Sequence, residues 1–590
     1  MKVLNKLLFR YKIASTVLML IISGFSAWAQ VDFKGGNITG NFKLDAQTYR
    51  EDSTIGAEKV AEKMLSNSYM NLIYTNGNFT AGVRFEGYFN TMLGYDNNYD
   101  GFGIANRYAT YAGEMFEVTV GNFYDQFGNG LIFRTYEDKD LGYDNSMDGA
   151  RIKFRPLPGI ILKGVIGNQR LYWEKGEGIV RGVDGEFALN DLFSSLAASD
   201  NRITLSGSFV NKYQADENPI YILPENVGAG AGMLNFSRGN FSLATEYAYK
   251  SQDPSADNNL IYKSGSAFLI NSDYSVNGLG IMLQYKWVDN MSFRSERDAQ
   301  LNNLMINYLP AITKNHAYAL TAMYPYATQV DGEAGIQGEV FYKFKKETVL
   351  GGTYGTNITL NYARIQDIKR NPIDSSTPIG QTGTDGYTTS FLSMSDSLLN
   401  QDINFEITKK ISEKYKVVFV YQHLDFNQLA LQGHGKEYNG MVNSNTFVAD
   451  VYWRIKPKHT LRIESEALFT KAVDFTTQQN EVVKIKQDFG NWVMLMLEYS
   501  VSPHWFFAVS DQFNYVSTNK KTAENTFEYL HRQYPFNRNH FFSMAMGYSK
   551  GASRIQVSYG KQREGILCVG GVCRPVPAAY GFNISVSSTF

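Results

Sequence analysis

Two cysteines are the first residues whose spacing suggests chemistry. Cys568 and Cys573 flank Val-Gly-Gly-Val at 569–572, and a Gly-Gly pair favours a tight hairpin because glycine tolerates positive φ. With a two-residue turn the cysteines face each other across the strands, within bonding reach. One cysteine pair with no nearby histidine is poor zinc spacing. In an exported chain the sequence therefore predicts a disulfide, which we expect on the outer side of the last two strands.

A Gly-x-Ser-x-Gly match at residues 547–551 suggests a hydrolase nucleophile. In hydrolases this serine lies on a turn between a strand and a helix, whereas here the match ends a strand and enters a hairpin turn. The seven histidines show no metal-binding spacing. The sequence therefore predicts a protein that is not an enzyme and that holds no cofactor.

Acidic residues in two loops match the start of a calcium-binding loop. Residues 96–101 read Asp-Asn-Asn-Tyr-Asp-Gly, but the twelfth position is Arg107, where such a loop needs glutamate. Asp138 and Asp140 begin a similar run that breaks at Gly142. A calcium site in the loops is therefore the weaker interpretation, and ordinary acidic turns are favoured.

The elements that position these residues must be strands, because beyond residue 29 apolar side chains recur at every second position. In residues 447–455, for example, Phe447, Val451 and Trp453 alternate with more polar neighbours. One apolar and one polar face are typical of a β-strand. Many such segments run to about ten residues, which is longer than strands of soluble sheets.

Short and long connections alternate along most of the chain. Short turns on one side and long loops on the other are typical of an outer-membrane barrel. We predict an all-β fold, a single antiparallel transmembrane β-barrel of about 26 strands, with 24 equally acceptable, short periplasmic turns and long extracellular loops. Short connections include residues 76–78, 157–159, 313–315, 456–458 and 502–504, and long ones include 51–65, 90–104, 124–147, 213–224, 290–302, 366–400, 428–443 and 518–537.

In such a barrel the polar strand faces line the lumen. Charged lumen residues either select ions and substrates or pair with one another as a filling. Their mixed signs leave both interpretations open. The predicted lumen residues are Arg84, Glu86, Arg151, Lys153, Arg155, Arg462, Glu464 and Glu466.

Residues 124–147 form the connection that points most strongly to a function. This loop is long and unusually apolar, and barrels of about 22 strands already need a plug. We predict that it folds inward or caps the mouth, with residues 366–400 as a second candidate, although packing on neighbouring loops is the alternative. The predicted plug residues are Phe127, Leu131, Ile132, Phe133 and Tyr136.

The first 29 residues predict export. A basic start, an apolar stretch over residues 13–25 and the sequence Ala27-Trp28-Ala29 match a cleaved signal peptide. We therefore expect a signal peptide at 1–29 and one barrel domain at 30–590 in the Gram-negative outer membrane.

The chain ends in an aromatic residue at the end of a predicted strand. Tyr580 and Phe582 share a face with Phe590, which resembles the signal read by the outer-membrane insertion machinery. The predicted partners are that machinery, outer-membrane lipid, and a solute or protein at the loops. Nucleic acid is not expected, because 56 basic and 57 acidic residues leave no positive excess.

Three stretches resemble an uncharacterised family of Gram-negative outer-membrane barrels, known only as a domain of unknown function. They are residues 120–124 (Val-Gly-Asn-Phe-Tyr), 141–149 (Leu-Gly-Tyr-Asp-Asn through Asp-Gly) and 563–574, which hold the cysteines. The resemblance covers most of the mature chain. It implies the location and the single domain, and brings no reaction, substrate or site residue.

Two functions follow from this sequence. The first is a loop-occluded channel or solute-binding transporter, in which lumen charges and residues 124–147 control access. The alternative is a sealed structural barrel, a scaffold or accessory of a secretion, assembly or surface-attachment complex. Shortening 124–147 should raise permeability only in the first case.

Overall fold

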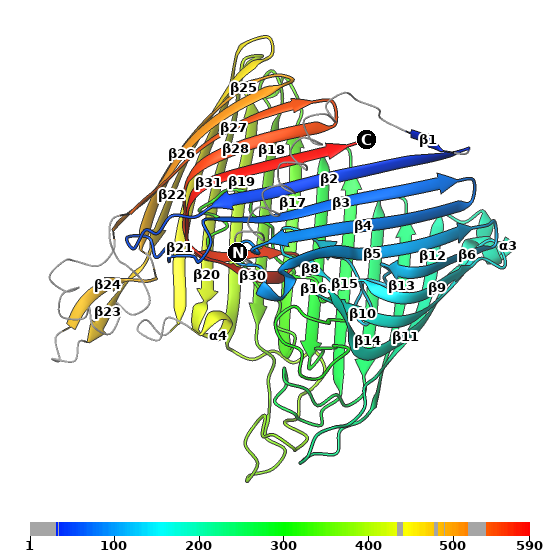
Figure 1. Ribbon diagram of the computed structural model, residues 1–590. Helices are drawn as coiled ribbons and strands as arrows, with labels where there is room; N and C mark the ends of the chain where they lie inside the picture. The colour runs from blue at the N-terminus through cyan, green and yellow to red at the C-terminus, as the bar shows by residue number, and fades with distance from the viewer. Residues whose placement is uncertain (1–30, 34, 434–439, 477–481, 489, 517–538) are drawn as a thin grey trace, which may run out of the picture.

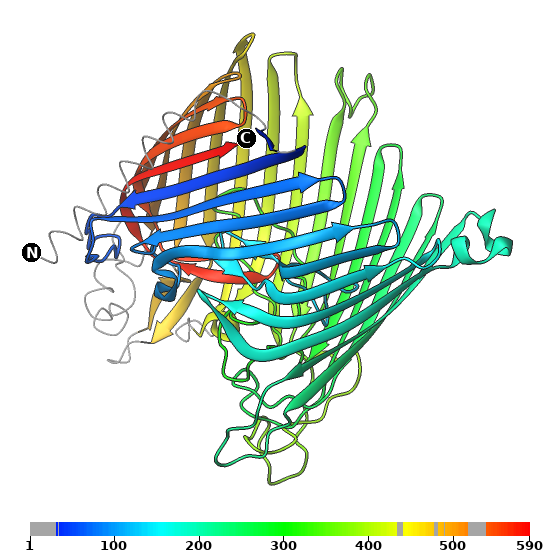
Figure 2. The ribbon, with the colours of Figure 1, turned by 45° about the vertical axis from the view of Figure 1, so that its right-hand side comes forward.

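The computed structural model describes residues 31–33, 35–433, 440–476, 482–488, 490–516 and 539–590. The predicted signal peptide at 1–29 lies outside these residues. One large antiparallel sheet closes on itself as a barrel (Figures 1 and 2). Each barrel strand pairs with the next barrel strand along the chain, and β2 pairs with β31 to complete the ring.

The described residues form 24 barrel strands. The first twelve are β2 (Gly36–Thr48), β3 (Met64–Asn76), β4 (Phe79–Phe89), β5 (Gly101–Ala112), β6 (Phe116–Phe123), β9 (Met147–Phe154), β10 (Ile160–Leu171), β11 (Glu174–Ala188), β12 (Asn201–Tyr213), β13 (Asn226–Arg238), β14 (Phe241–Lys250) and β15 (Gly265–Val276). The others are β16 (Leu279–Asp289), β17 (Gly332–Phe344), β18 (Thr356–Gln366), β19 (Leu398–Lys410), β20 (Tyr415–Asn427), β21 (Met441–Lys456), β22 (His459–Thr470), β25 (Asn491–Val501), β26 (Trp505–Val516), β27 (His540–Lys550), β28 (Ser553–Gln562) and β31 (Ala579–Thr589).

Small elements decorate this ring. β1 (Val31–Phe33) folds back on β2, and three separate two-stranded sheets pair β7 (Glu137–Asp138) with β8 (Tyr143–Asp144), β23 (Ala472–Thr476) with β24 (Val482–Lys486), and β29 (Gly565–Val569) with β30 (Val572–Val576). The helical turns are η1 (Asn97–Tyr99), α2 (Leu189–Leu192), α3 (Ser194–Ala197) and α4 (Gln428–Gln432). None of the helices in the described ranges is long and apolar enough to cross a membrane.

Alternation along the strands separates an apolar outer surface from the lumen. On β12, Leu205 and Phe209 point outward and are exposed, whereas Val210 points inward and is fully buried. A closed barrel satisfies every ladder hydrogen bond, so such an apolar belt can face lipid. The predicted antiparallel outer-membrane barrel is thereby confirmed.

The C-terminus closes the ring. The backbone of Phe590 exchanges hydrogen bonds of 2.8 and 2.9 Å with Gly40 on β2. A Cβ at position 40 would lie 2.6 Å from the Phe590 ring, so glycine makes room for the terminal aromatic side chain. Whether Phe590 also signals insertion stays a prediction.

The strand number is 24, the lower of the two predicted values, because one expected hairpin is absent from the described wall. The sequence predicted strands on both sides of a turn at 313–315. Instead, all of residues 290–331 leave the wall between β16 and β17. Pro310 within this stretch cannot donate to a strand ladder, and it disfavours a membrane strand there.

Candidate functional site

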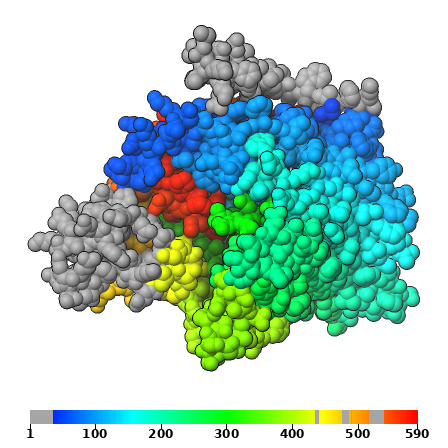
Figure 3. Space-filling model, turned by 60° about the horizontal axis from the view of Figure 1, so that its bottom comes forward, coloured from blue at the N-terminus to red at the C-terminus, as the bar shows by residue number. Residues whose placement is uncertain are grey.

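Three chain segments meet inside the barrel, and we call them together the plug. They are residues 124–146 between β6 and β9, residues 290–331 between β16 and β17, and residues 563–578 between β28 and β31. Figure 3 views the end that carries the long loops, and there the third segment (red) lies beside residues near 300 (green). All three enter from the end that the barrel rule makes extracellular.

Apolar side chains of the first segment pack against the inner wall. Phe127, Leu131, Ile132 and Phe133 are each 0% exposed and share a core with inward residues of β10–β16. The rings of Phe127 and Phe133 lie 4.8 Å apart at 42°. A Cβ on Gly182 of β11 would lie 2.8 Å from the Phe127 ring, so this glycine allows the close approach.

Tyr136 links the first plug segment to the second. Its ring lies 5.9 Å from that of Tyr308 in an edge-to-face contact. The guanidinium of Arg134 lies 4.7 Å from the Tyr136 ring and 4.0 Å from the Tyr308 ring. Aromatic and cation–π contacts of this kind hold segments together without a regular ladder.

A buried ion-pair network joins the first segment to the wall. Arg84 on β4 contacts Glu86 at 2.7 Å, and it also pairs with Glu137 and Asp144 of the plug. Arg170 on β10 contacts Glu86 at 2.7 Å and Asp144 at 2.6 Å. The two arginines therefore hold two plug carboxylates against the wall, and the predicted lumen residues Arg84 and Glu86 belong to this network.

The charge of Asp144 depends on these arginines. Burial raises the pKa of its carboxyl, but Arg170 and Arg84 outweigh burial and leave the pKa below its ordinary value. The carboxylate also accepts hydrogen bonds from the Ser146 amide and the Tyr124 hydroxyl, both at 2.9 Å. Asp144 is thus an ionised anchor of the plug.

The same carboxylates form a cluster with metal-binding spacing. Ligand atoms of Glu86, Glu137 and Asp144 lie within 4.8 Å of one another. Guanidinium groups of Arg84 and Arg170 contact these oxygens and supply the positive charge. The calcium-like loop residues are also engaged, since Asp96 accepts from the Asn98 amide and Asp138 from the Asp140 amide.

The second group of predicted lumen residues lies on β9 and just after it. Arg151 contacts Asp125 of the plug at 2.6 Å and Glu117 of β6 at 2.7 Å. Arg155 lies 3.9 Å from Glu117. Lys153 lies opposite Glu117 in the ladder, on the same inward face. The structure therefore brings Arg151, but not Lys153 or Arg155, into contact with the plug.

The third group lies on β22 and meets the second plug segment. Arg462 pairs with Asp450 at 2.9 Å and with Glu464. Glu466 accepts hydrogen bonds from the backbone amides of Ala319 at 3.1 Å and Leu320 at 2.9 Å. The Glu466 carboxylate therefore caps a turn of the plug from across the barrel.

Sequence reasoning missed the second plug segment, which crosses the lumen. Its backbone is bound by wall side chains along its length. Gln169 of β10 donates to Met305 O at 2.7 Å, and Lys286 of β16 donates to Pro310 O. Further on, His316 contacts Asp402 of β19. The signals in the sequence were Pro310 and the loss of alternation over residues 304–312.

The third segment contains the predicted disulfide, which is confirmed between Cys568 and Cys573. The hairpin lies at the end that carries the long loops, the outer side on which the sequence placed it, and there it turns into the mouth and packs on the second segment. Gly570 O accepts from the Tyr308 hydroxyl at 2.7 Å, and Cys573 O accepts from the Asn302 amide at 2.7 Å.

The second candidate for an inward loop, residues 366–400, does not fold inward, because its connection between β18 and β19, residues 367–397, lies outside the barrel. The carbonyl of Ser393 accepts from the indole of Trp287, an outward residue of β16, at 3.1 Å. Phe391 makes edge-to-face contacts with Trp287 at 5.2 Å and with Tyr247 of β14 at 5.8 Å. The loop folds over the outer wall because outward aromatics there offer an apolar surface.

Comparison with known proteins places the chain in one family and names no activity. No curated protein matches the sequence. A model described as a family of unknown function, DUF6029, matches residues 9–590, which confirms the resemblance seen in the sequence.

Solved structures with a similar fold include three outer-membrane barrels. The translocation pore of the P pilus usher PapC is 9% identical, with 94% of this chain and 99% of that chain covered and a TM-score of 0.42. The siderophore receptor PirA of Pseudomonas aeruginosa is 8% identical, with 94% and 80% covered and a TM-score of 0.37. OccK5 (OpdH) of the same organism is 10% identical, with 67% and 94% covered and a TM-score of 0.35.

Proposed function

The chain belongs to the family of unknown function DUF6029, and we propose from its filled mouth that it is a closed outer-membrane channel or solute-binding transporter. The plug blocks the extracellular end, and the lumen charges that hold it control access. The proposal includes export through a cleaved signal peptide at 1–29, insertion through Phe590, and no catalytic role.

The observation that carries the proposal is the uneven filling of the lumen. Inward residues of β15 change along the strand from the buried Ala267 and Leu269 near the plug to the exposed Asp273 and Ser275 near the short turns. Lys343 at the same end of β17 is exposed as well. Water therefore reaches a polar vestibule below the plug, which a purely structural barrel does not need.

The kind of contact between plug and wall supports a movable plug. Much of the docking comes from side chains such as Glu466 and Arg84, which hold plug groups by hydrogen bonds and ion pairs. When the plug moves, water can form hydrogen bonds with the polar groups that it leaves behind. A polar group left unpaired in a core without water would cost far more free energy. A solute that binds these groups can therefore compete with the plug.

A sealed scaffold is the second candidate, because apolar residues stand at the tip of the extracellular loops. Ile220 and Ile222 are 78% and 88% exposed. Their loop is braced by the Tyr262 hydroxyl, which donates to Ile222 O at 2.9 Å. Exposed apolar side chains on a braced loop suit contact with a protein partner.

Planar-bilayer conductance of the folded chain tests the proposal. One variant lacks residues 126–146, a second has residues 292–329 replaced by a short Gly-Ser linker, and a third combines both. A matched control lacks residues 372–394, which lie outside the wall. We expect a closed wild type, a closed control, and large steps in the combined variant. A combined variant that folds and stays silent refutes the channel and favours the scaffold.

A further inference from the structure

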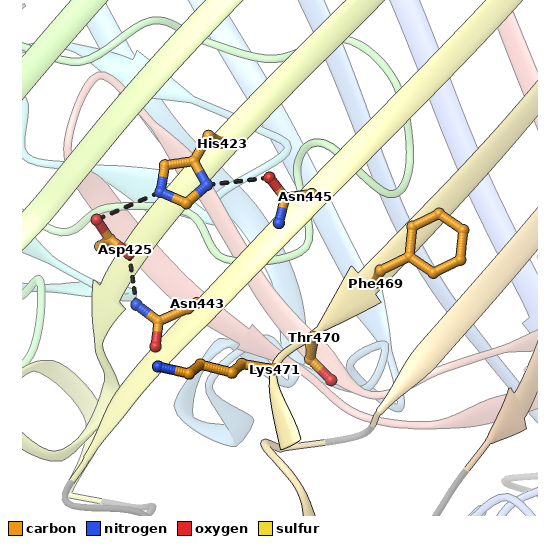
Figure 4. A pocket seen from close by; sticks show the side chains of 7 residues that line it. All are labelled: His423, Asp425, Asn443, Asn445, Phe469, Thr470 and Lys471. Carbon is orange, nitrogen blue, oxygen red and sulfur yellow. Dashed lines mark hydrogen bonds and ion pairs between the residues drawn. The ribbon is translucent and has the colours of Figure 1, made fainter. Parts of the chain in front are cut away.

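A cavity with several polar side chains in its lining lies on the outer surface of the barrel, away from the plug. It has a volume of about 410 Å³ and is lined by His423, Asp425, Asn443, Asn445, Phe469, Thr470 and Lys471, from β20, β21 and the end of β22 (Figure 4). The intervening residues Leu424, Val442 and Leu468 are buried in the core that contains the plug. Since neighbours on a strand point to opposite faces, His423 and Asn443 point away from the lumen.

The cavity lies at the level where the membrane meets water. Tyr421 and Phe447, just nearer the membrane centre on the same outward faces, have ring centroids 5.1 Å apart. Phe447 and Phe469 are 6.3 Å apart, which continues the aromatic row onto β22. Aromatic girdles mark the interfaces of outer-membrane barrels, so the polar residues beyond this row reach headgroup depth.

Four polar side chains of the cavity are connected by hydrogen bonds and one close contact. Asn445 Oδ1 lies 3.0 Å from His423 Nδ1 and accepts from the Tyr421 hydroxyl at 2.9 Å. Asp425 accepts from the side-chain amide of Asn443 at 2.5 Å and lies 3.6 Å from His423 Nε2. Figure 4 shows the side chains of these four lining residues and of Lys471 around one space, with Phe469 at its edge.

One lysine and one aspartate, Lys471 and Asp425, line the cavity, and Arg364 adds a second cation two strands away. Lys471 is exposed, and its ammonium makes no ion pair with any residue of the described ranges. Arg364 on β18, which β19 separates from β20, also points outward and donates to Gln401 at 2.6 Å, and Gln401 in turn donates to Asp425 at 2.9 Å. A phosphate group suits Lys471, because charged donors bind it more strongly than neutral ones, and Arg364 adds positive charge nearby.

We propose that this cavity binds the phosphorylated sugar headgroup of an outer-leaflet glycolipid. Lys471 and His423 contact the phosphate, the amides of Asn443 and Asn445 bind sugar hydroxyls, and Phe469 packs on the apolar face of the sugar ring. A lipid is the occupant, because the exposed aromatic row directly below is where its acyl chains lie. The bound lipid fixes the depth of β20–β22 in the membrane.

Native mass spectrometry of the full-length folded chain in detergent tests this site. The probes are bisphosphorylated lipid A, its dephosphorylated form and glucosamine phosphate. The test variant combines Lys471→Ala with His423→Ala. The control is Lys175→Ala, an outward cation at the extracellular end of β11 that pairs with Asp148 at 2.8 Å.

We expect the wild type and the Lys175 control to retain lipid A equally. The double variant should bind it about tenfold more weakly, as should the wild type with the dephosphorylated lipid. Equal lipid A binding by a correctly folded double variant overturns the proposal. Glucosamine phosphate binding the wild type as tightly as lipid A also overturns it, because the site then serves a soluble ligand.

Discussion

Truncation of Phe133 to alanine should open the channel without unfolding the barrel. The Phe133 ring is fully buried between the plug and the wall. The carbonyl of Phe133 accepts a hydrogen bond of 3.0 Å from the Phe127 amide within the plug. The barrel ladder makes no use of the ring. Removing the ring should therefore lower the stability of the docked plug more than the stability of the barrel sheet.

The magnitude follows from the burial of the ring. Removing a fully buried phenylalanine side chain costs about 3–5 kcal/mol, part transfer and part cavity. Each 1.4 kcal/mol changes an equilibrium constant about tenfold. If most of this loss weakens the docked state, the ratio of undocked to docked plug rises roughly a hundredfold or more.

Single-channel recording compares Phe133→Ala with Phe209→Ala. Phe209 is the matched control, because it is the same residue type on β12 but points to lipid, 51% exposed. We expect opening events about a hundred times more frequent than in the wild type for Phe133→Ala only. A Phe133→Ala protein that unfolds more easily but never opens would refute the movable plug.

Three further perturbations test the plug and its anchors. Asp144→Asn leaves two buried arginines short of a carboxylate, so it should cost about 3–5 kcal/mol of docking and raise opening frequency in the same recordings. Burial raises the pKa of Asp331 to about 6. Between pH 3.8 and about 6 the Asp331 carboxyl therefore keeps its proton in the folded state and loses it in the unfolded state. The free energy of unfolding falls as pH rises through that window. Asp331→Asn should remove this slope and add about 2–3 kcal/mol at pH 7 in urea unfolding; an unchanged slope would contradict it. Cys568→Ser should cost only about 2 kcal/mol, because the disulfide closes a very short loop, and a loss of folding would show a larger role.

The location and type of the strands followed from the sequence, as did two wall residues of the ion-pair network and the loop that meets them. Arg84 and Glu86 alternate on a strand, and residues 124–147 are too apolar for an exposed loop. Both signals are local, because the two-residue period and the composition of a loop need no knowledge of partners. The pairing of Arg84 with Asp144 was not predictable, since nothing in either stretch specifies the other.

What the sequence by itself determined is the barrel, its approximate size and the hairpin that pairs Cys568 with Cys573. Only the tertiary structure decided that residues 290–331 cross the lumen, that the cysteine hairpin turns inward and that residues 367–397 cover the outer wall. The physical reason is that an irregular segment has no periodicity of its own to read. Its backbone groups are satisfied by distant wall side chains, such as Glu466 beneath Ala319 and Leu320, and those partners come together only when the ring closes.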